Sequence, residues 1–197
     1  MKNKLKKIIK TNRTKIKSNI FQIATIVLII DQFVKILVTL NLKEMHSYEI
    51  INNFFSLYYV KNTGAAFSIL EDQTLILIIL SLIILIVLNN YITLLTKSTK
   101  LERISLGLII GGILGNLIDR LIYNSVIDFL SFKIFNYSFP VFNLADTAIV
   151  IGVILFIIAS IKENISNKGA KDLVIKEKPK KKKTSKKKKN NSKKWRK

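Results

Sequence analysis

Residues 107–120 read GLIIGGILGNLIDR, an apolar helical stretch that carries a ridge of glycines and ends in polar residues. Gly107, Gly111 and Gly115 recur at every fourth position, with Gly112 beside them, and this spacing places the three on one helix face. A helix face without side chains lets a neighbouring helix approach backbone to backbone in a membrane. The stretch therefore predicts a membrane helix that packs tightly against a neighbour.

The polar end of this stretch contains Asn116, Asp119 and Arg120. Asn116 and Arg120 lie one turn apart and share a face, whereas Asp119 and Arg120 are adjacent, diverge, and are expected to find partners on other segments. Placing an ionisable side chain within a membrane span costs free energy, so each such residue is expected to have a structural or functional role. The cluster is either structural or binds a substrate backbone.

Four apolar stretches are each near the roughly 20 residues that a bilayer span requires. They cover residues 20–40, 75–95, 104–122 and 143–161. The first follows a basic segment, as in a secretory signal, but no small-residue cleavage site follows it, so we expect an uncleaved helix. The chain of 197 residues is therefore predicted to be a mainly helical integral membrane protein whose single domain spans residues 20–161.

The net charge of +21 lies at the two ends of the chain. Residues 1–19 carry eight basic groups and no acid, and residues 162–197 have a net charge of +14. The net charge is −2 for the loop 41–72 and +2 for the turn 96–103. Because basic residues favour the cytoplasmic side, both termini and the 96–103 turn are predicted to be cytoplasmic, with 41–72 and 123–142 outside.

The lysine-rich segment 162–197 has few apolar residues, so we expect a disordered cytoplasmic tail. It serves to fix topology, and it can also contact anionic lipid or RNA, because both attractions are electrostatic.

The outer loop 41–72 contains an aromatic and β-branched run at 54–60, the turn signal Asn62-Thr63-Gly64 and a second apolar run at 65–67. This order predicts a small extracytoplasmic β-hairpin at the outer interface, with its turn at Asn62–Gly64. Tyrosine and phenylalanine suit that depth. An irregular amphipathic loop is the alternative interpretation.

The first span contains Asp31 and Lys35, whose four-residue spacing lets them pair on one helix face. A neutralised structural pair is the simpler interpretation of these two residues. In either case the pair has to face protein or water rather than lipid.

Two further acids lie near span ends. Asp128 follows the third span in an apolar setting, and Asp146 opens the fourth. Asn143 is a natural N-cap and Asp146 would hold the third helical position, so Asp146 could be a capping residue alone. Topology nevertheless places both acids, residues 116–120 and the 62–64 turn on one side of the membrane. Two carboxylates near an apolar surface can share a proton, as acid/base activation of water requires.

The absence of cysteine excludes disulfides, thiolate nucleophiles and Cys-based zinc sites. The single histidine, His46, excludes a metalloprotease motif with two histidines. These absences leave only sites built chiefly from carboxylates, Ser, Lys or backbone groups, and we expect no metal and no cofactor.

Five motifs together resemble the lipoprotein signal peptidases, or signal peptidase II, an aspartic endopeptidase family of the bacterial cytoplasmic membrane. They stand in the family's order and spacing across residues 20–161. The motifs are Asp31–Lys35 (DQFVK), Asn62–Ser68 (NTGAAFS), Gly112–Arg120 (GILGNLIDR), Val126–Phe129 (VIDF) and Phe142–Asp146 (FNLAD).

The resemblance implies cleavage of prolipoproteins just before the cysteine that has received a diacylglyceryl group, in contact with membrane phospholipid. It implies that Asp128 and Asp146 are catalytic and that they hold a water between them, one removing its proton and the other donating. Proximity to the helix N-terminus favours the ionised form of Asp146 and so favours it as the base, but a coupled pair titrates jointly, so both assignments stay open. The residues on which the family's supporting positions fall are Asp31, Lys35, Asn62, Gly64, Asn116, Asp119, Arg120 and Asn143.

A small ion- or proton-coupled transporter is the rival hypothesis, because intramembrane carboxylates are equally typical of ion pathways. Four spans are few for a transporter, no inverted repeat is evident, and the acids gather at one face. The glycine ridge can be used within one chain, so it leaves the oligomeric state open; we expect a monomer.

Overall fold

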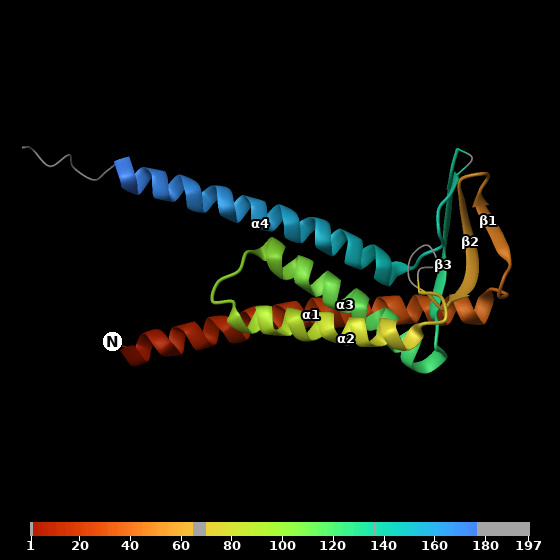
Figure 1. The fold of residues 1–197 in the computed structure, drawn as a ribbon, viewed down its shortest axis with the longest axis horizontal. Coiled ribbons are helices and arrows are strands. Elements are labelled where there is room, and N and C mark those ends of the chain that lie inside the picture. Colours follow the sequence, from red (N-terminus) through yellow and green to blue (C-terminus); the bar gives the residue numbers. More distant parts are fainter. Residues whose placement is uncertain (1, 65–69, 136, 177–197) are drawn as a thin grey trace, which may run out of the picture. The chain divides into compact units, whose positions relative to one another are not determined.

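The computed structural model describes residues 2–64, 70–135 and 137–176. Within these residues lie helices α1 (Lys2–Asn41), α2 (Thr74–Leu94), α3 (Lys100–Tyr123) and α4 (Leu144–Lys176), and strands β1 (Ser47–Ile51), β2 (Phe55–Asn62), β3 (Val126–Ile134) and β4 (Tyr137–Ser138) (Figure 1). Each helix contains a segment long and apolar enough to cross a membrane, which confirms the predicted four spans. The chain divides into two compact units, Met1–Ile161 and Lys162–Lys197.

Helix α3 is the most enclosed of the four helices. In its most apolar window 67% of the residues are buried, against 22% in α1, 11% in α2 and 22% in α4. Thr99 caps its start by accepting a hydrogen bond from the Glu102 backbone N–H at 3.0 Å. At its other end Asn124 adopts a left-handed conformation with φ of 54° and donates its N–H to the Arg120 carbonyl.

The glycine ridge of α3 contacts α1, as the spacing predicts. A Cβ atom added to Gly107 would lie 2.6 Å from Ile23 Cβ, and one added to Gly111 would lie 2.7 Å from the Ala24 carbonyl oxygen. Gly112 faces the Ala145 carbonyl of α4 in the same way. The backbone of α3 therefore lies directly against two neighbouring helices, and any side chain at these positions would separate them.

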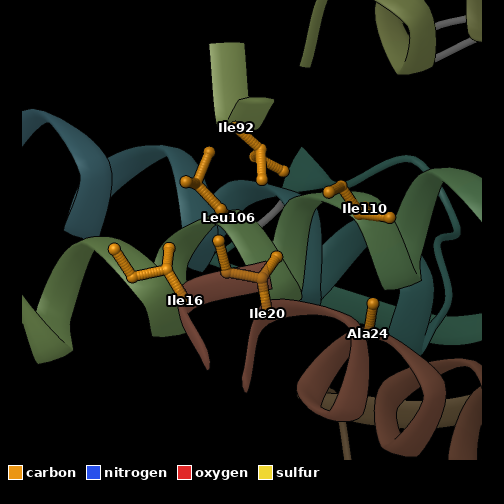
Figure 2. Close-up of a cluster of buried hydrophobic side chains, with 6 residues drawn as sticks. All are labelled: Ile16, Ile20, Ala24, Ile92, Leu106 and Ile110. Atoms are coloured by element: carbon orange, nitrogen blue, oxygen red, sulfur yellow. The ribbon is translucent and has the colours of Figure 1, made fainter. Parts of the chain in front are cut away.

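An apolar cluster joins three helices at the N-terminal half of α3 (Figure 2). Its buried members come from α1, α2 and α3, and within a membrane such side chains hold helices together by van der Waals packing rather than by removal from water. The members are Ile16, Ile20, Ala24, Ile92, Leu106 and Ile110.

The four strands form one antiparallel sheet in the order β1-β2-β3-β4, and in Figure 1 the strands run across the ends of the helices. Strand β1 pairs with β2 around a turn in which Asn53 has a φ of 56° and its N–H bonds to Glu49 Oε1 at 2.6 Å. Strands β1 and β2 thus form a hairpin whose turn is at residues 52–54, upstream of the predicted turn. At Asn62–Gly64 the Gly64 N–H donates to Asn62 Oδ1 at 2.9 Å, as in a local turn, and the hairpin predicted around it stays a prediction. The second apolar run, 65–67, lies outside the described residues.

Strand β3 was not predicted from the sequence, although it forms the centre of the sheet. It pairs with β2 through the register Val60↔Asp128 and Asn62↔Val126. The register shifts between Leu57 and Val60, where β2 holds two residues opposite one of β3. Such bulges bend a strand and redirect its side chains, and this one lies beside Asp128.

Helices α1 and α4 extend beyond the predicted spans. Helix α4 continues to Lys176, so the expectation of disorder from residue 162 was wrong for 162–176, while 177–197 lies outside the described residues. A helix that is already formed adds residues at little cost, and the first proline after the span is Pro179.

We expect Gly111→Ala to destabilise the protein by about 1–3 kcal/mol, because the new methyl group would meet the Ala24 carbonyl of α1, which cannot move without the helix. The measurement is thermal unfolding in detergent micelles. Leu82→Ala on the exposed face of α2 is the matched control and should change the unfolding temperature less. Equal stability of Gly111→Ala and the wild type would contradict the close packing.

Candidate active site

Asp128 lies on β3 with only 2% of its surface exposed. Both carboxylate oxygens accept hydrogen bonds from side-chain amides: Asn62 donates to Oδ2 at 2.8 Å and Asn143 donates to Oδ1 at 2.7 Å. Asn62 and Asp128 are diagonal neighbours on one face of the sheet, because Asn62 pairs with Val126. The sheet, which only long-range pairing forms, therefore brings the Asn62 motif to this acid.

Asp146 lies in the first turn of α4 and takes part in the capping box that the sequence predicts. Its backbone N–H donates to Asn143 Oδ1 at 2.9 Å, and the Asn143 N–H donates back to Asp146 Oδ2 at 3.2 Å. The other oxygen, Oδ1, accepts from Asn116 Nδ2 at 2.7 Å. Asp146 thus caps the helix and also joins the polar cluster of α3, so the two roles considered for it are compatible.

Asn143 and Asn116 link the two acids. The Asn143 side chain is fully buried, and its Nδ2 donates both to Asp128 Oδ1 and, at 3.0 Å, to Asn116 Oδ1. Lys35 donates to the same Asn116 oxygen at 3.0 Å. With its oxygen held by two donors, Asn116 turns its Nδ2 toward Asp146, so the orientation of both amides is fixed by the network.

The predicted pair of Asp31 and Lys35 is formed, and Asp119 joins it. Lys35 Nζ lies 2.9 Å from Asp31 Oδ2 and 2.8 Å from Asp119 Oδ2, and the three residues are at most 1% exposed. They face protein, as a charged group within a span must. Gln32, which was not predicted as a site residue, donates to Asp119 Oδ1 at 2.9 Å. A polar amide beside Asp31 in an apolar span was the signal for it.

Arg120 connects α3 to the end of β2. Its Nη2 donates to the Gly64 carbonyl at 3.0 Å, and the Gly64 N–H donates to Asn62 Oδ1 at 2.9 Å. Arg120 and Asp119 do find partners on different segments, as their adjacent positions predict. The Arg120 Nε is buried and has no hydrogen-bond partner among the described residues.

The environment of Asp128 favours its neutral form. Burial, and after it the negative charge of Asp146, raise the pKa of Asp128 to about 7, although the hydrogen bonds from Asn62 and Asn143 and the charge of Lys35 lower it. The other four buried charges near the pair, on Asp31, Lys35, Asp119 and Arg120, have two positive and two negative members, which offset one another.

Two carboxyl groups that share one proton can act as an acid and a base in the same step. In the described part of the chain, no three His, Asp or Glu side chains are arranged to hold a metal ion.

A sequence model of the family described as Signal peptidase (SPase) II matches residues 23–162. The chain belongs to this family. It is therefore a peptidase, of the aspartic type, and the transporter hypothesis has no support.

Relatives and solved structures agree with this membership of the signal peptidase II family. The lipoprotein signal peptidases of Staphylococcus aureus strains JH9 and Newman are each 38% identical to the chain over 151 residues, which is 77% of this chain and 92% of theirs. Two solved structures of a bacterial membrane enzyme, determined by the in meso method at 2.3 Å and 1.9 Å, are 36% identical. The TM-scores of the two structures are 0.69 and 0.66. The matched region is 75% and 74% of this chain, and 90% and 94% of the chains in those structures. The chain is thus a multi-pass membrane protein.

Proposed function

We propose that this signal peptidase II removes signal peptides from prolipoproteins by using Asp128 and Asp146 as a catalytic pair. The observation that carries the proposal is that two carboxyl groups, from different elements, are joined through Asn143, which contacts both. The relatives' name, lipoprotein signal peptidase, supports the substrate class. Cleavage before a diacylglyceryl-modified cysteine is the specific reaction that the family motifs imply.

The proposed mechanism needs one proton on the pair. Ionised Asp146, at the helix N-terminus, removes a proton from water as the water attacks the scissile carbonyl carbon. Neutral Asp128 donates its proton to the carbonyl oxygen, giving a tetrahedral diol. The diol collapses when the proton taken by Asp146 passes to the leaving nitrogen and Asp128 recovers its own proton from the diol hydroxyl. The peptide bond breaks without a covalent intermediate.

Arg120 is suited to hold the substrate backbone. A buried donor without a partner costs about 1–3 kcal/mol, and a peptide carbonyl oxygen of the substrate is a suitable acceptor for its Nε. Asn62 and Gly64 hold the adjoining end of β2 against Arg120 and Asp128. A substrate backbone that lies against this end of β2 would contact both the Arg120 guanidinium and the pair of acids.

The orientation we propose places both termini in the cytoplasm and the site near the outer face of the bacterial cytoplasmic membrane. The distribution of basic residues supports it, because residues 1–19 and the 96–103 turn are basic while 41–72 is acidic. Asp128 follows the end of α3 closely, as expected for a site near the membrane surface.

The organisation we propose is a monomeric catalytic domain over residues 20–161. The ridge at Gly107 and Gly111 is already covered by α1 of the same chain, so it is not available to a second copy. The basic segment 162–197 would contact anionic lipid or RNA and take no part in catalysis.

Replacing either acid tests the catalytic pair. We expect Asp128→Asn and Asp146→Asn each to lower cleavage of a diacylglyceryl-modified prolipoprotein by at least about 100-fold, because each removes one proton-transfer group. Glu71→Gln, at an exposed acid, is the matched control and should cleave normally. Both variants should insert into membranes like the wild type, and retained cleavage by either one would refute the assignment.

The pH dependence tests the shared proton. Since the pKa of Asp128 is raised to about 7, the group is neutral below that pH and loses its proton above it, so the cleavage rate should fall as pH rises through about 7. Asn62→Ala removes a hydrogen bond that lowers this pKa and should move the fall to higher pH. The measurement is kcat against pH. A rate that does not fall above pH 7, or a fall that Asn62→Ala leaves in place, would contradict a neutral Asp128.

A further inference from the structure

Two buried acids outside the catalytic pair each bind the backbone directly before one of its members. Asp31 Oδ1 accepts the Ala145 N–H at 2.9 Å, and Ala145 precedes Asp146. Asp119 Oδ2 accepts the Ile127 N–H at 3.1 Å, and Ile127 precedes Asp128. Neither bond belongs to a helix or to the sheet ladder, so each one fixes the start of a different element to a separate carboxylate.

Lys35 connects these two carboxylates. Its ammonium group has three N–H donors, and three acceptors surround it: Asp31 Oδ2 at 2.9 Å, Asp119 Oδ2 at 2.8 Å and Asn116 Oδ1 at 3.0 Å. Gln32 Nε2 adds a second link, at 3.3 Å to Asp31 Oδ2 and 2.9 Å to Asp119 Oδ1. Ala145 and Ile127 are thereby joined through one buried, fully hydrogen-bonded chain of side chains.

We propose that Asp31, Lys35 and Asp119 form a bracket that sets the separation and orientation of Asp128 and Asp146. These three are positioning residues, because each acts on the catalytic pair through the backbone or through Asn116. The inference rests on the proposed function of the two catalytic acids. It gives a specific task, through named backbone contacts, to three residues that the family resemblance places only among the supporting positions.

The energetics favour positioning over stability as the reason for the bracket. A buried ion pair seldom stabilises a protein more than apolar residues of similar volume would, because both charges lose their hydration. By contrast, a misplacement of about 1 Å between reacting groups can cost about 100-fold in rate. The bracket also leaves little room for adjustment, because a Cβ atom at Gly115 would lie 2.5 Å from Asp31 Oδ2.

A pair of variants at Asp119 tests the bracket. Asp119→Leu removes the acceptor for the Ile127 N–H and the partner of Lys35, so we expect kcat to fall by at least about 100-fold. Asp119→Asn keeps one side-chain oxygen as an acceptor, and we expect a fall of about 10-fold. KM should stay within threefold of the wild-type value in both, because the bracket contacts no substrate. Cleavage of a diacylglyceryl-modified prolipoprotein by purified enzyme supplies both constants.

Gln32→Leu provides a second test that leaves all charges in place, so that the result does not depend on the folding of Asp119→Leu. It removes only the secondary link, and we expect kcat to fall about three- to tenfold at unchanged KM. Tyr91→Phe is the matched control, since it removes a half-buried 2.7 Å hydrogen bond to Glu102 at the opposite end of α3. It should lower the unfolding temperature without lowering kcat.

Normal kcat in Asp119→Leu or in Gln32→Leu would overturn the bracket. So would a fall in kcat for Tyr91→Phe as large as that for Asp119→Asn, since the loss would then follow general stability. Asp128→Asn and Asp146→Asn in the same assay separate the two proposals. If these two variants retain cleavage, the catalytic assignment fails. If they are inactive while Asp119→Leu and Gln32→Leu have normal kcat, only the bracket fails.

Discussion

The burial of charge at one end of a membrane helix bundle is the constraint on which the rest of this structure depends. An ionised side chain within a span must be paired with another charge or with a full set of hydrogen bonds. Lys35 meets this condition with Asp31, Asp119 and Asn116, and its two acids in turn hold backbone N–H groups of α4 and β3. The elements that carry Asp128 and Asp146 are therefore placed by the same contacts that make the buried charges tolerable.

The close approach of the helices makes this network possible. The side chains of Asp31 and Lys35 can reach Asn116 and Asp119 only because glycines on α3 let the α1 backbone lie against it. Gly115 continues the ridge at the level of the acids, and there it makes room for a carboxylate rather than for a helix. The apolar packing and the polar site thus use one glycine ridge, which explains why the two occur together in residues 107–120.

The sheet adds what a helical bundle lacks. A carboxyl group on a lipid-facing helix would be either exposed to lipid or fully paired, whereas Asp128 lies on a strand that leaves the membrane span directly after α3. The bulge in β2 and the diagonal contact with Asn62 hold it in a buried environment that favours its neutral form. Asp146 stands instead in the first turn of a helix, so the environments of the two acids differ.

Local features of the sequence were sufficient for the four spans, the pairing of Asp31 with Lys35, the glycine contact surface and the capping box at Asn143 and Asp146. Each depends on residues three or four positions apart or on a single apolar run, and helix geometry alone relates them. The turn of the hairpin, strand β3 and the role of Gln32 could not be read in this way. Strand register and the orientation of the Asn116 and Asn143 amides depend on contacts between separate elements. The bonds that Ile127 donates to Asp119 and that Ala145 donates to Asp31 join residues 8 and 114 positions apart. Only the tertiary structure decides such contacts, because every one of them depends on where several helices and strands have packed.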